Sequence, residues 1–125
     1  MNERTLIIVG AINMFIAVCC GAFGAHGLKK ILSDEMLVIW HTAVTYQVMH
    51  ALGMIAIALL MPKFGGAMMS WAGNLMLAGI VIFSGSLYLL ALTGTRVLGA
   101  ITPIGGVAFL AAWLLVGWSA YKGMR

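Results

Sequence analysis

The sequence alternates between long apolar stretches and short polar ones. No Asp, Glu, Lys or Arg occurs within residues 5–28, 36–62, 64–95 or 97–121. Each of these stretches exceeds the roughly 20 residues that an α-helix needs to cross the hydrocarbon core of a bilayer. Strands of a membrane barrel would alternate apolar and polar residues at every second position, and these stretches do not alternate. The pattern therefore predicts an all-α fold, a bundle of four transmembrane helices.

Local start and stop signals set the helix boundaries within this single membrane domain, residues 1–125. Ser33, which precedes two acidic residues, is typical of an N-cap. Pro62 is expected to end the second helix. Thr102 followed by Pro103 predicts a cap with proline at the first helical position. The predicted helices comprise about residues 5–23, 34–61, 71–92 and 103–121.

The ends of the helices carry signs of the membrane interface. Apolar residues recur at helical spacing from Leu28 to Ile39, which predicts a short amphipathic segment between the first two helices. Aromatic residues near helix ends are expected at headgroup depth. These residues are Trp40, Trp71, Trp118 and Tyr121.

The positive charges do not decide the orientation of the bundle. The side that holds both termini carries four Lys or Arg residues, and the opposite side carries three. The four are Arg4, Lys63, Lys122 and Arg125, and the three are Lys29, Lys30 and Arg96. This small difference favours termini in the cytoplasm only slightly, and it permits insertion both ways up.

Composition excludes several classes of protein. Hydrophobic residues make up 63% of the 125 residues and charged residues only 8%, against about 25% charged in soluble domains. A soluble protein this small could not bury four such apolar stretches, so a soluble enzyme, a nucleic-acid-binding domain and a disulfide scaffold are excluded. The net charge of +4 is spread over both sides of the membrane. It therefore predicts lipid phosphates rather than nucleic acid as partners.

Small residues gather on one face of three helices, which predicts close packing between helices. On the first helix this face consists of Gly10, Asn13, Ala17, Cys20, Gly21 and Gly24. On the third it consists of Asn74, Ala78, Gly85 and Tyr88, and on the fourth of Gly105, Ala108, Ala112 and Ser119.

The second helix is the most polar of the four. Tyr46 and His50 are four residues apart and could form a hydrogen bond. His50 is either a proton carrier or binding group, or a neutral imidazole whose hydrogen bonds are satisfied inside the bundle. Polar residues within the spans either support packing or line a permeation path. The candidates are Asn13, Thr42, Tyr46, Gln47, His50, Asn74, Ser84 and Ser86.

The sequence does not predict an enzyme, a cofactor or a metal site. His41 and His50 lie on opposite sides of the second helix and cannot chelate one metal ion. A dyad of Cys20 and His26 would need a thiol of lowered pKa, and no nearby group would lower it. No acidic residue lies within a span, which excludes a proton-coupled antiporter of the four-helix multidrug type.

Four motifs resemble those of a known family. The segment GAFGAHGL at residues 21–28 contains Gly21, Phe23, Gly24, His26 and Gly27. With residues 42–52, 83–88 and 98–106, it resembles the YgdD/YwdK-like family of small inner-membrane proteins. This is a domain-of-unknown-function group related to eukaryotic transmembrane protein 256. The resemblance implies a four-helix protein of the bacterial inner (plasma) membrane, and it carries no established activity.

Two hypotheses of function follow. In the first, the protein is a homo-oligomer that binds lipid headgroups or a partner membrane protein. Its anion site would use the N-terminus of the fourth helix, with Arg96, Thr93, Thr95, Thr102 and Gly105. In the alternative, the protein is a channel for a small ion or solute. The channel would be lined by Asn13, Ser84, Ser86, Tyr46 and His50.

Overall fold

The computed structural model describes residues 1–123 and contains helices and no strand in that range, which confirms the all-α class. Four helical stretches are long and apolar enough to cross a membrane: Glu3–His26, Asp34–Phe64, Gly66–Thr93 and Arg96–Gly123. In detail, the elements are α1 (Glu3–His26), η1 (Leu28–Lys30), α2 (Asp34–Phe64), α3 (Gly66–Gly79), η2 (Ile80–Ser84), α4 (Gly85–Thr93), η3 (Arg96–Ala100) and α5 (Thr102–Gly123).

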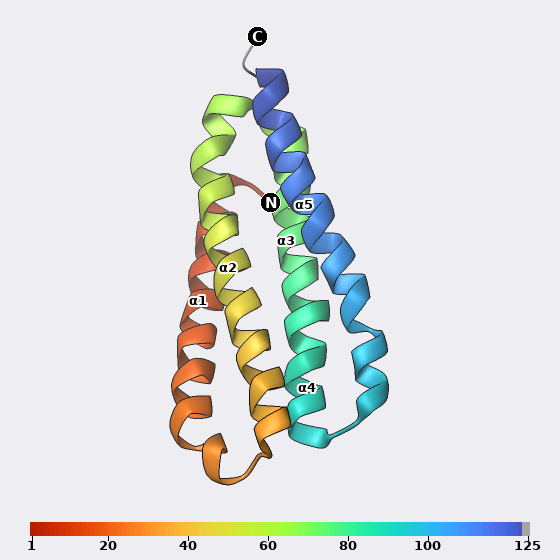
Figure 1. Ribbon diagram of the computed structural model, residues 1–125. Coiled ribbons are helices and arrows are strands. Elements are labelled where there is room, and N and C mark those ends of the chain that lie inside the picture. The colour runs from red at the N-terminus through yellow and green to blue at the C-terminus, as the bar shows by residue number, and fades with distance from the viewer. Residues whose placement is uncertain (124–125) are drawn as a thin grey trace.

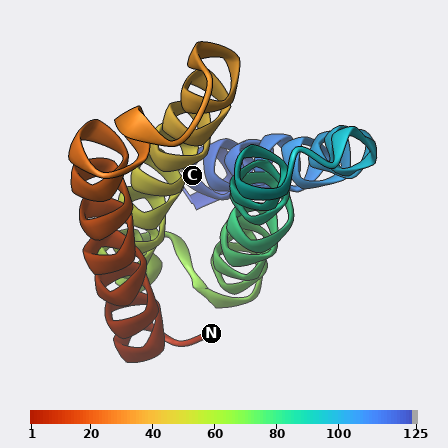
Figure 2. The same cartoon turned by 90° about the horizontal axis from the view of Figure 1, so that it is seen from below.

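Helix α2 occupies the centre of the bundle. It packs against α1 on one side and against α3 and α4 on the other, while α5 packs mainly on α3 and η2. Helices α2 and α5 lie close together near the C-terminus and diverge toward the start of α5 (Figure 1). Seen from below, α1 and the start of α5 lie on opposite sides of the molecule (Figure 2).

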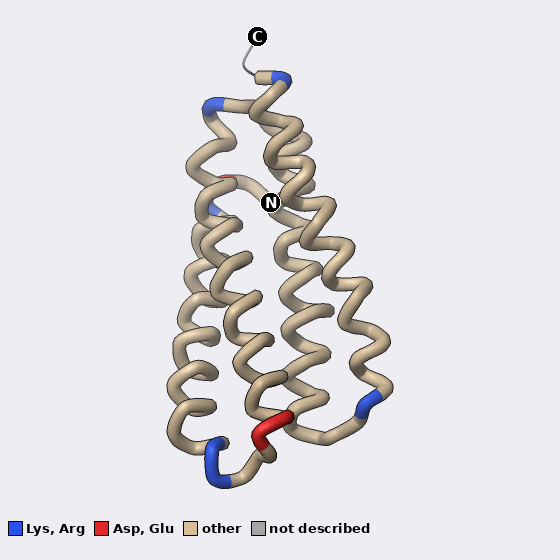
Figure 3. The backbone as a smooth tube through the Cα atoms, viewed as in Figure 1, with Lys and Arg blue, Asp and Glu red and all other residues tan. Residues whose placement is uncertain are grey.

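Within residues 1–123, charged residues are confined to the two ends of the bundle and the start of α1 (Figure 3). The end of α5 and the turn between α2 and α3 lie at one end, together with the N-terminal side of α1 (Figure 1). The turns before α2 and after α4 lie at the other end. This is the arrangement that four antiparallel spans predict, and it leaves the long middle section without formal charge.

The turn between α2 and α3 is much shorter than the sequence predicts. The expectation that Pro62 ends the second helix is wrong, because α2 continues to Phe64. A proline in the last turn of a helix removes only one backbone hydrogen bond, so the helix can pass through it. Gly65 ends α2 with a φ of 87°, a conformation that suits glycine. Helix α3 begins at Gly66 rather than near residue 71.

The connection between α1 and α2 is also shorter than expected. The predicted amphipathic segment is a single 3₁₀ turn, η1. Leu28 is buried in it, whereas Lys29 and Lys30 are exposed. Helix α2 then starts at Asp34 as predicted, and the Ser33 hydroxyl accepts a hydrogen bond of 3.2 Å from the backbone N–H of Met36.

The third span contains a π-helical turn that the sequence does not predict. This turn, η2, separates α3 from α4. Gly105 of α5 lies directly against it, since a Cβ atom there would be 2.4 Å from the Phe83 backbone nitrogen. The Phe83 carbonyl accepts a hydrogen bond of 2.9 Å from the Ser86 hydroxyl. The π-helical turn therefore lies at a close approach between α5 and the third span, which Gly105 permits.

The predicted packing faces of α1 and α5 are confirmed in part, since Cys20, Gly21 and Ala108 stay partly exposed, and that of the third span is not confirmed. Gly10, Asn13, Ala17 and Gly24 of α1 are buried. Gly105, Ala112 and Ser119 of α5 are also buried, together with Phe109. In the third span, Asn74, Ala78 and Gly85 remain partly exposed.

Trp40 was expected at the membrane interface, and this prediction is wrong, because the residue lies inside the bundle. It is 5% exposed, and its Nε1–H donates a hydrogen bond of 2.9 Å to the Cys20 carbonyl. Gly24 makes room for it, because a Cβ atom there would be 2.5 Å from the Trp40 Nε1. Trp71, Trp118 and Tyr121, in contrast, are exposed.

Candidate functional site

Two polar clusters lie on different sides of α2. We call the first the amide cluster, and it consists of Asn13 of α1, Gln47 of α2 and Tyr88 of α4. The Tyr88 hydroxyl donates to Gln47 Oε1 at 2.7 Å, and Gln47 Nε2 donates to Asn13 Oδ1 at 3.1 Å. Asn13 Nδ2 then donates to the Val9 carbonyl at 2.9 Å. Because Asn13 and Gln47 are buried, this chain of hydrogen bonds joins three helices away from lipid.

The second cluster forms a cavity that we call the aromatic groove. Its volume is about 420 Å³, and it lies between α2, η2 and α5. Val107 and Leu110 on its border are 64% and 67% exposed, so the groove opens on the lateral surface of the bundle. The lining residues are Tyr46, Met49, His50, Phe83, Pro103, Gly106, Val107, Phe109, Leu110 and Trp113.

His50 is fixed in one tautomer by its neighbours. Trp113 Nε1–H can only donate, so His50 Nε2 accepts its hydrogen bond of 3.0 Å. The proton of the neutral imidazole is therefore on Nδ1, which lies 2.7 Å from the Tyr46 carbonyl. The hydrogen bond to Tyr46 thus uses its backbone and not its side chain. These contacts favour the interpretation of His50 as a neutral imidazole that the bundle satisfies.

Three rings in the groove are nearly parallel. The His50 ring stacks on Phe109 with centroids 3.5 Å apart and an interplanar angle of 9°. The Tyr46 ring is tilted by only 10° from His50 and by 18° from Phe109. Phe83 of the π-helical turn contacts Tyr46 with centroids 4.5 Å apart. The groove is therefore lined by aromatic rings at the depth of His50, and two of these rings, those of His50 and Phe109, stack on each other.

The Tyr46 hydroxyl has no hydrogen-bond partner among residues 1–123. In the same part of the chain, no buried side-chain nitrogen or oxygen atom lacks a partner. The Tyr46 hydroxyl is therefore accessible from outside, although the residue as a whole is only partly exposed. It is a hydrogen-bond donor available in an otherwise apolar groove.

The other predicted polar residues have partners within the chain. The Ser84 hydroxyl donates to the Ala43 carbonyl at 2.8 Å, and the Thr42 hydroxyl donates to the Val38 carbonyl at 2.9 Å. Asn74 Oδ1 accepts a hydrogen bond of 3.1 Å from the Met1 amino group. Of the five residues expected to line a channel, Tyr46 and His50 share the groove, whereas Asn13, Ser84 and Ser86 are hydrogen-bonded to neighbouring groups. The channel stays a prediction.

The residues of the predicted anion site are engaged in contacts of their own. Arg96 forms a bidentate ion pair with Glu35, at 2.9 and 3.3 Å. The Thr93 hydroxyl donates to the Leu89 carbonyl at 2.6 Å and accepts from the Thr95 N–H at 3.3 Å. Thr102 shares a hydrogen bond of 2.6 Å with Ser86. The Thr102–Ser86 hydrogen bond and the packing of Gly105 against η2 fasten the start of α5, and binding of an anion there stays a prediction.

The GAFGAHGL motif forms the end of α1 and its contact with α2. Phe23 packs edge to face against Trp40, with ring centroids 6.4 Å apart. At Gly27, a Cβ atom would be 2.6 Å from the Phe23 ring, so a larger residue would displace that ring. A Cβ atom at Gly21 would make an ordinary contact of 3.5 Å with Val44, and His26 is exposed. Most of this motif therefore serves packing.

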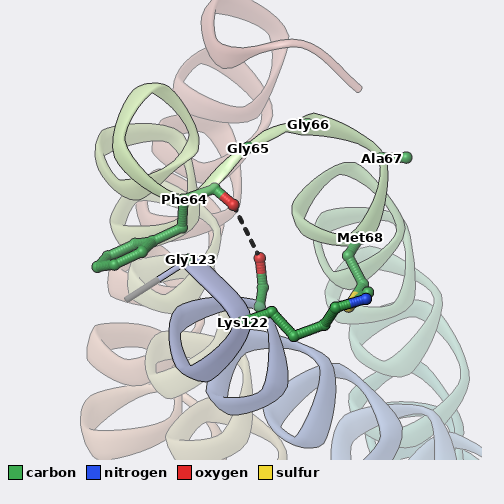
Figure 4. Close-up of a pocket in the computed structure, with 8 residues that line it drawn as sticks. Phe64, Gly65, Gly66, Ala67, Met68, Lys122 and Gly123 are labelled. Carbon is green, nitrogen blue, oxygen red and sulfur yellow. Dashed lines mark hydrogen bonds between the residues drawn. The ribbon is translucent and has the colours of Figure 1, made fainter. Parts of the chain in front are cut away.

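A second cavity, of about 320 Å³, lies at the opposite end, between the α2–α3 turn and the end of α5 (Figure 4). The buried Ser119 hydroxyl donates to the Phe64 carbonyl at 3.4 Å. The side chains of Met68 and Lys122 lie next to each other on one side of this cavity (Figure 4). These contacts fasten the C-terminal end of α5 to the turn.

Sequence reasoning identified Tyr46 and His50 but missed Phe83, Phe109 and Trp113. One signal was available for Trp113, which lies in the middle of an apolar helix rather than at its end. An indole N–H inside a membrane needs an acceptor, and His50 is an obvious one. Which face of α5 would meet α2 was not evident from the pattern.

Comparison with known proteins gives the family. The family described as "Protein of unknown function (DUF423)" matches residues 20–106. The UPF0382 membrane protein YwdK of Bacillus subtilis is 51% identical over 95% of this chain and 98% of its own length. A UPF0382 membrane protein of Staphylococcus epidermidis is 53% identical over 90% of this chain and 92% of its own. No solved structure matches the chain.

These findings confirm the resemblance and narrow the location. The relatives named above come from Gram-positive bacteria, so the membrane that they indicate is the cell membrane. The expected multi-pass topology agrees with the four candidate spans. The chain therefore belongs to the UPF0382 (DUF423) family of multi-pass membrane proteins.

Proposed function

We propose that the protein is a non-catalytic membrane protein that binds a lipid in the aromatic groove. The observation that carries this proposal is a lateral cavity of about 420 Å³ between α2, η2 and α5, bordered by exposed apolar side chains. A cavity of this size falls within the range of about 300–1,000 Å³ that is typical of ligand pockets. Because its opening faces the hydrocarbon, a ligand would enter from the membrane.

The shape of the groove supports an elongated apolar ligand. Its lining on α5 extends from Pro103 to Trp113, which corresponds to about 15 Å along the helix. Gly106 contributes no side chain to this wall, and a Cβ atom there would still be 3.9 Å from Phe83. There is therefore free space beside Gly106, and only a side chain longer than that of alanine would fill it.

Headgroup binding at Arg96 and self-association are two further parts of the proposal. A lipid phosphate would have to compete with Glu35 for the Arg96 guanidinium. Self-association would use the face of the third span formed by Asn74, Ala78 and Gly85, which remains partly exposed. Small residues on such a face allow close approach of another helix.

The experiment compares two substitutions on one helix. We would introduce Gly106→Leu, which fills the groove, and Gly117→Leu, where a Cβ atom meets no atom within 4 Å and which does not line the groove. Both replace glycine by a better helix former, so neither should weaken α5 intrinsically. Each protein is released from nanodiscs made of bacterial membrane lipid extract, and bound lipids are counted by native mass spectrometry.

We expect the wild type and Gly117→Leu to retain a discrete lipid and Gly106→Leu to lose it. Equal retention by all three proteins, or none by the wild type, would refute binding in the groove. The same spectra give the number of chains in each particle, and a wild-type monomer would contradict self-association. Lipid loss on Arg96→Ala would support the headgroup site, and unchanged retention would argue against it.

A further inference from the structure

The unpaired hydroxyl of Tyr46 restricts what the groove can hold. The other polar side chains that line it have partners, because His50 is bonded to Trp113 and to the Tyr46 carbonyl. Only the Tyr46 hydroxyl, among the polar groups lining the groove within residues 1–123, makes no hydrogen bond. A ligand that fits the groove well should therefore contain an acceptor for this donor.

The depth of Tyr46 in the membrane restricts which lipids could accept its hydrogen bond. Tyr46 lies twelve residues after Asp34, the charged start of α2, which is about 18 Å along the helix. Since the hydrocarbon core is about 30 Å thick, the backbone of Tyr46 lies well inside it, where water is scarce. The ester carbonyls of a phospholipid lie near the headgroups, at the border of the hydrocarbon core. An acceptor that a lipid carries deeper in the bilayer therefore suits the Tyr46 hydroxyl better.

The walls of the groove favour a flat ring. The rings of Tyr46, Phe83 and Trp113 line the groove beside the stacked pair of His50 and Phe109. Aromatic rings attract other flat rings through offset stacking and edge-to-face contacts. A saturated acyl chain would gain nothing from such faces that aliphatic side chains could not supply. No acidic residue lines the groove, so a cation has no counter-charge there.

We propose that the lipid in the groove is a quinone-type ring lipid, whose ring carbonyl accepts the hydrogen bond of the Tyr46 hydroxyl. Its conjugated ring lies against the aromatic walls, and its isoprenoid tail follows the apolar border formed by Val107 and Leu110. This inference rests on the proposed function, because it names the class of lipid that the same groove binds. It concerns binding alone.

The test uses two probes and a matched pair of tyrosine variants. Nanodiscs of phosphatidylglycerol contain increasing mole fractions of either a short-chain menaquinone or squalene, an isoprenoid hydrocarbon without an acceptor. Native mass spectrometry measures the fraction of protein that carries each probe. Tyr46→Phe removes the unpaired hydroxyl, whereas Tyr121→Phe makes the same change at an exposed residue that does not line the groove.

We expect the wild type to bind menaquinone in preference to squalene. Tyr46→Phe should weaken menaquinone binding roughly three- to tenfold, the usual effect of one lost hydrogen bond, and should leave squalene binding unchanged. Tyr121→Phe should behave as the wild type. Tyr46→Phe should also retain the wild-type melting temperature, because its hydroxyl makes no hydrogen bond within the chain.

The possible results separate this inference from the proposed function. If menaquinone binds no better than squalene, or binds equally to Tyr46→Phe, the quinone assignment is wrong. Lipid binding in the groove would still hold if Gly106→Leu abolishes retention of membrane lipid. If Gly106→Leu and Gly117→Leu retain lipid alike, the groove binds no lipid and both proposals fail.

Discussion

The amide cluster and the aromatic groove are built from neighbouring residues of one helix, yet they differ in how completely their polar groups are paired. In the amide cluster, Gln47 connects Asn13 to Tyr88, and each of the three side chains has a partner. In the groove, the hydroxyl of Tyr46, the residue next to Gln47, has none among residues 1–123. A fully paired cluster inside a membrane serves structure, whereas an unpaired donor at an open cavity is available for a ligand.

The difference arises from how the neighbouring helices cover α2. Helix α1 packs closely on α2 at Gly10. A Cβ atom at this position would be only 3.0 Å from the Ala51 carbonyl oxygen, so a larger residue would push the helices apart. Helix α5, in contrast, diverges from α2 toward its own start (Figure 1). The amide cluster is therefore covered on both sides, and the groove is open on one. Identical types of side chain acquire different roles through this difference in packing.

The largest effect is expected for the centre of the amide cluster. Gln47→Leu keeps the volume but leaves the Tyr88 hydroxyl and Asn13 Oδ1 without their partner. We expect a loss of about 2–4 kcal/mol in the free energy of unfolding, measured by SDS titration in mixed micelles. Thr45→Val on the same helix, at an exposed residue, is the control and should change stability by less than about 0.5 kcal/mol. Equal effects of the two variants would show that the hydrogen bonds of the amide cluster do not stabilise the fold.

The fold could be predicted largely because membrane spans depend on long uncharged stretches, which a sequence displays directly. The errors concern local details that depend on contacts elsewhere in the chain. Pro62 lies within α2, because the exposed last turn tolerates a missing hydrogen bond and Gly65 supplies the turn. Trp40 is buried, because Gly24 on another helix leaves space for its ring. No signal in residues 80–84 predicted the π-helical turn that packs against Gly105.

Of the aromatic groove, only residues of α2 could be predicted from the sequence. The spacing of Tyr46 and His50 placed them on one face, and the structure brings both to the groove. Their partners Phe83, Phe109 and Trp113 come from helices whose rotation relative to α2 depends on the whole bundle. The connection of Gln47 with Tyr88 and Asn13 likewise joins residues 41 and 34 positions apart. A single sequence does not record such pairings.

A smaller effect should distinguish two adjacent glycines of α5. Gly105→Ala places a Cβ atom 2.4 Å from the Phe83 nitrogen, a backbone atom that cannot move aside, and should cost about 1–3 kcal/mol of unfolding free energy. Gly106→Ala lines the open groove, where the nearest atom is 3.9 Å away, and should stabilise the helix by up to about 1 kcal/mol. SDS titration of both variants measures the difference. If both variants were equally stable, the close contact at the π-helical turn would be disproved.

The smallest effect provides the sharpest comparison, because it removes the same atom from each region. Tyr88→Phe deprives Gln47 Oε1 of its donor inside the covered cluster, and should lower the free energy of unfolding by about 1 kcal/mol. Tyr46→Phe removes a hydroxyl that makes no hydrogen bond within residues 1–123, and should change it by less than about 0.5 kcal/mol. The measurement is made in lipid-free mixed micelles, so that a ligand of the groove does not add to the stability of the Tyr46 protein. If Tyr46→Phe lowered the free energy of unfolding as much as Tyr88→Phe, the Tyr46 hydroxyl would be paired within the chain. The distinction between a structural amide cluster and a ligand-binding groove would then be wrong.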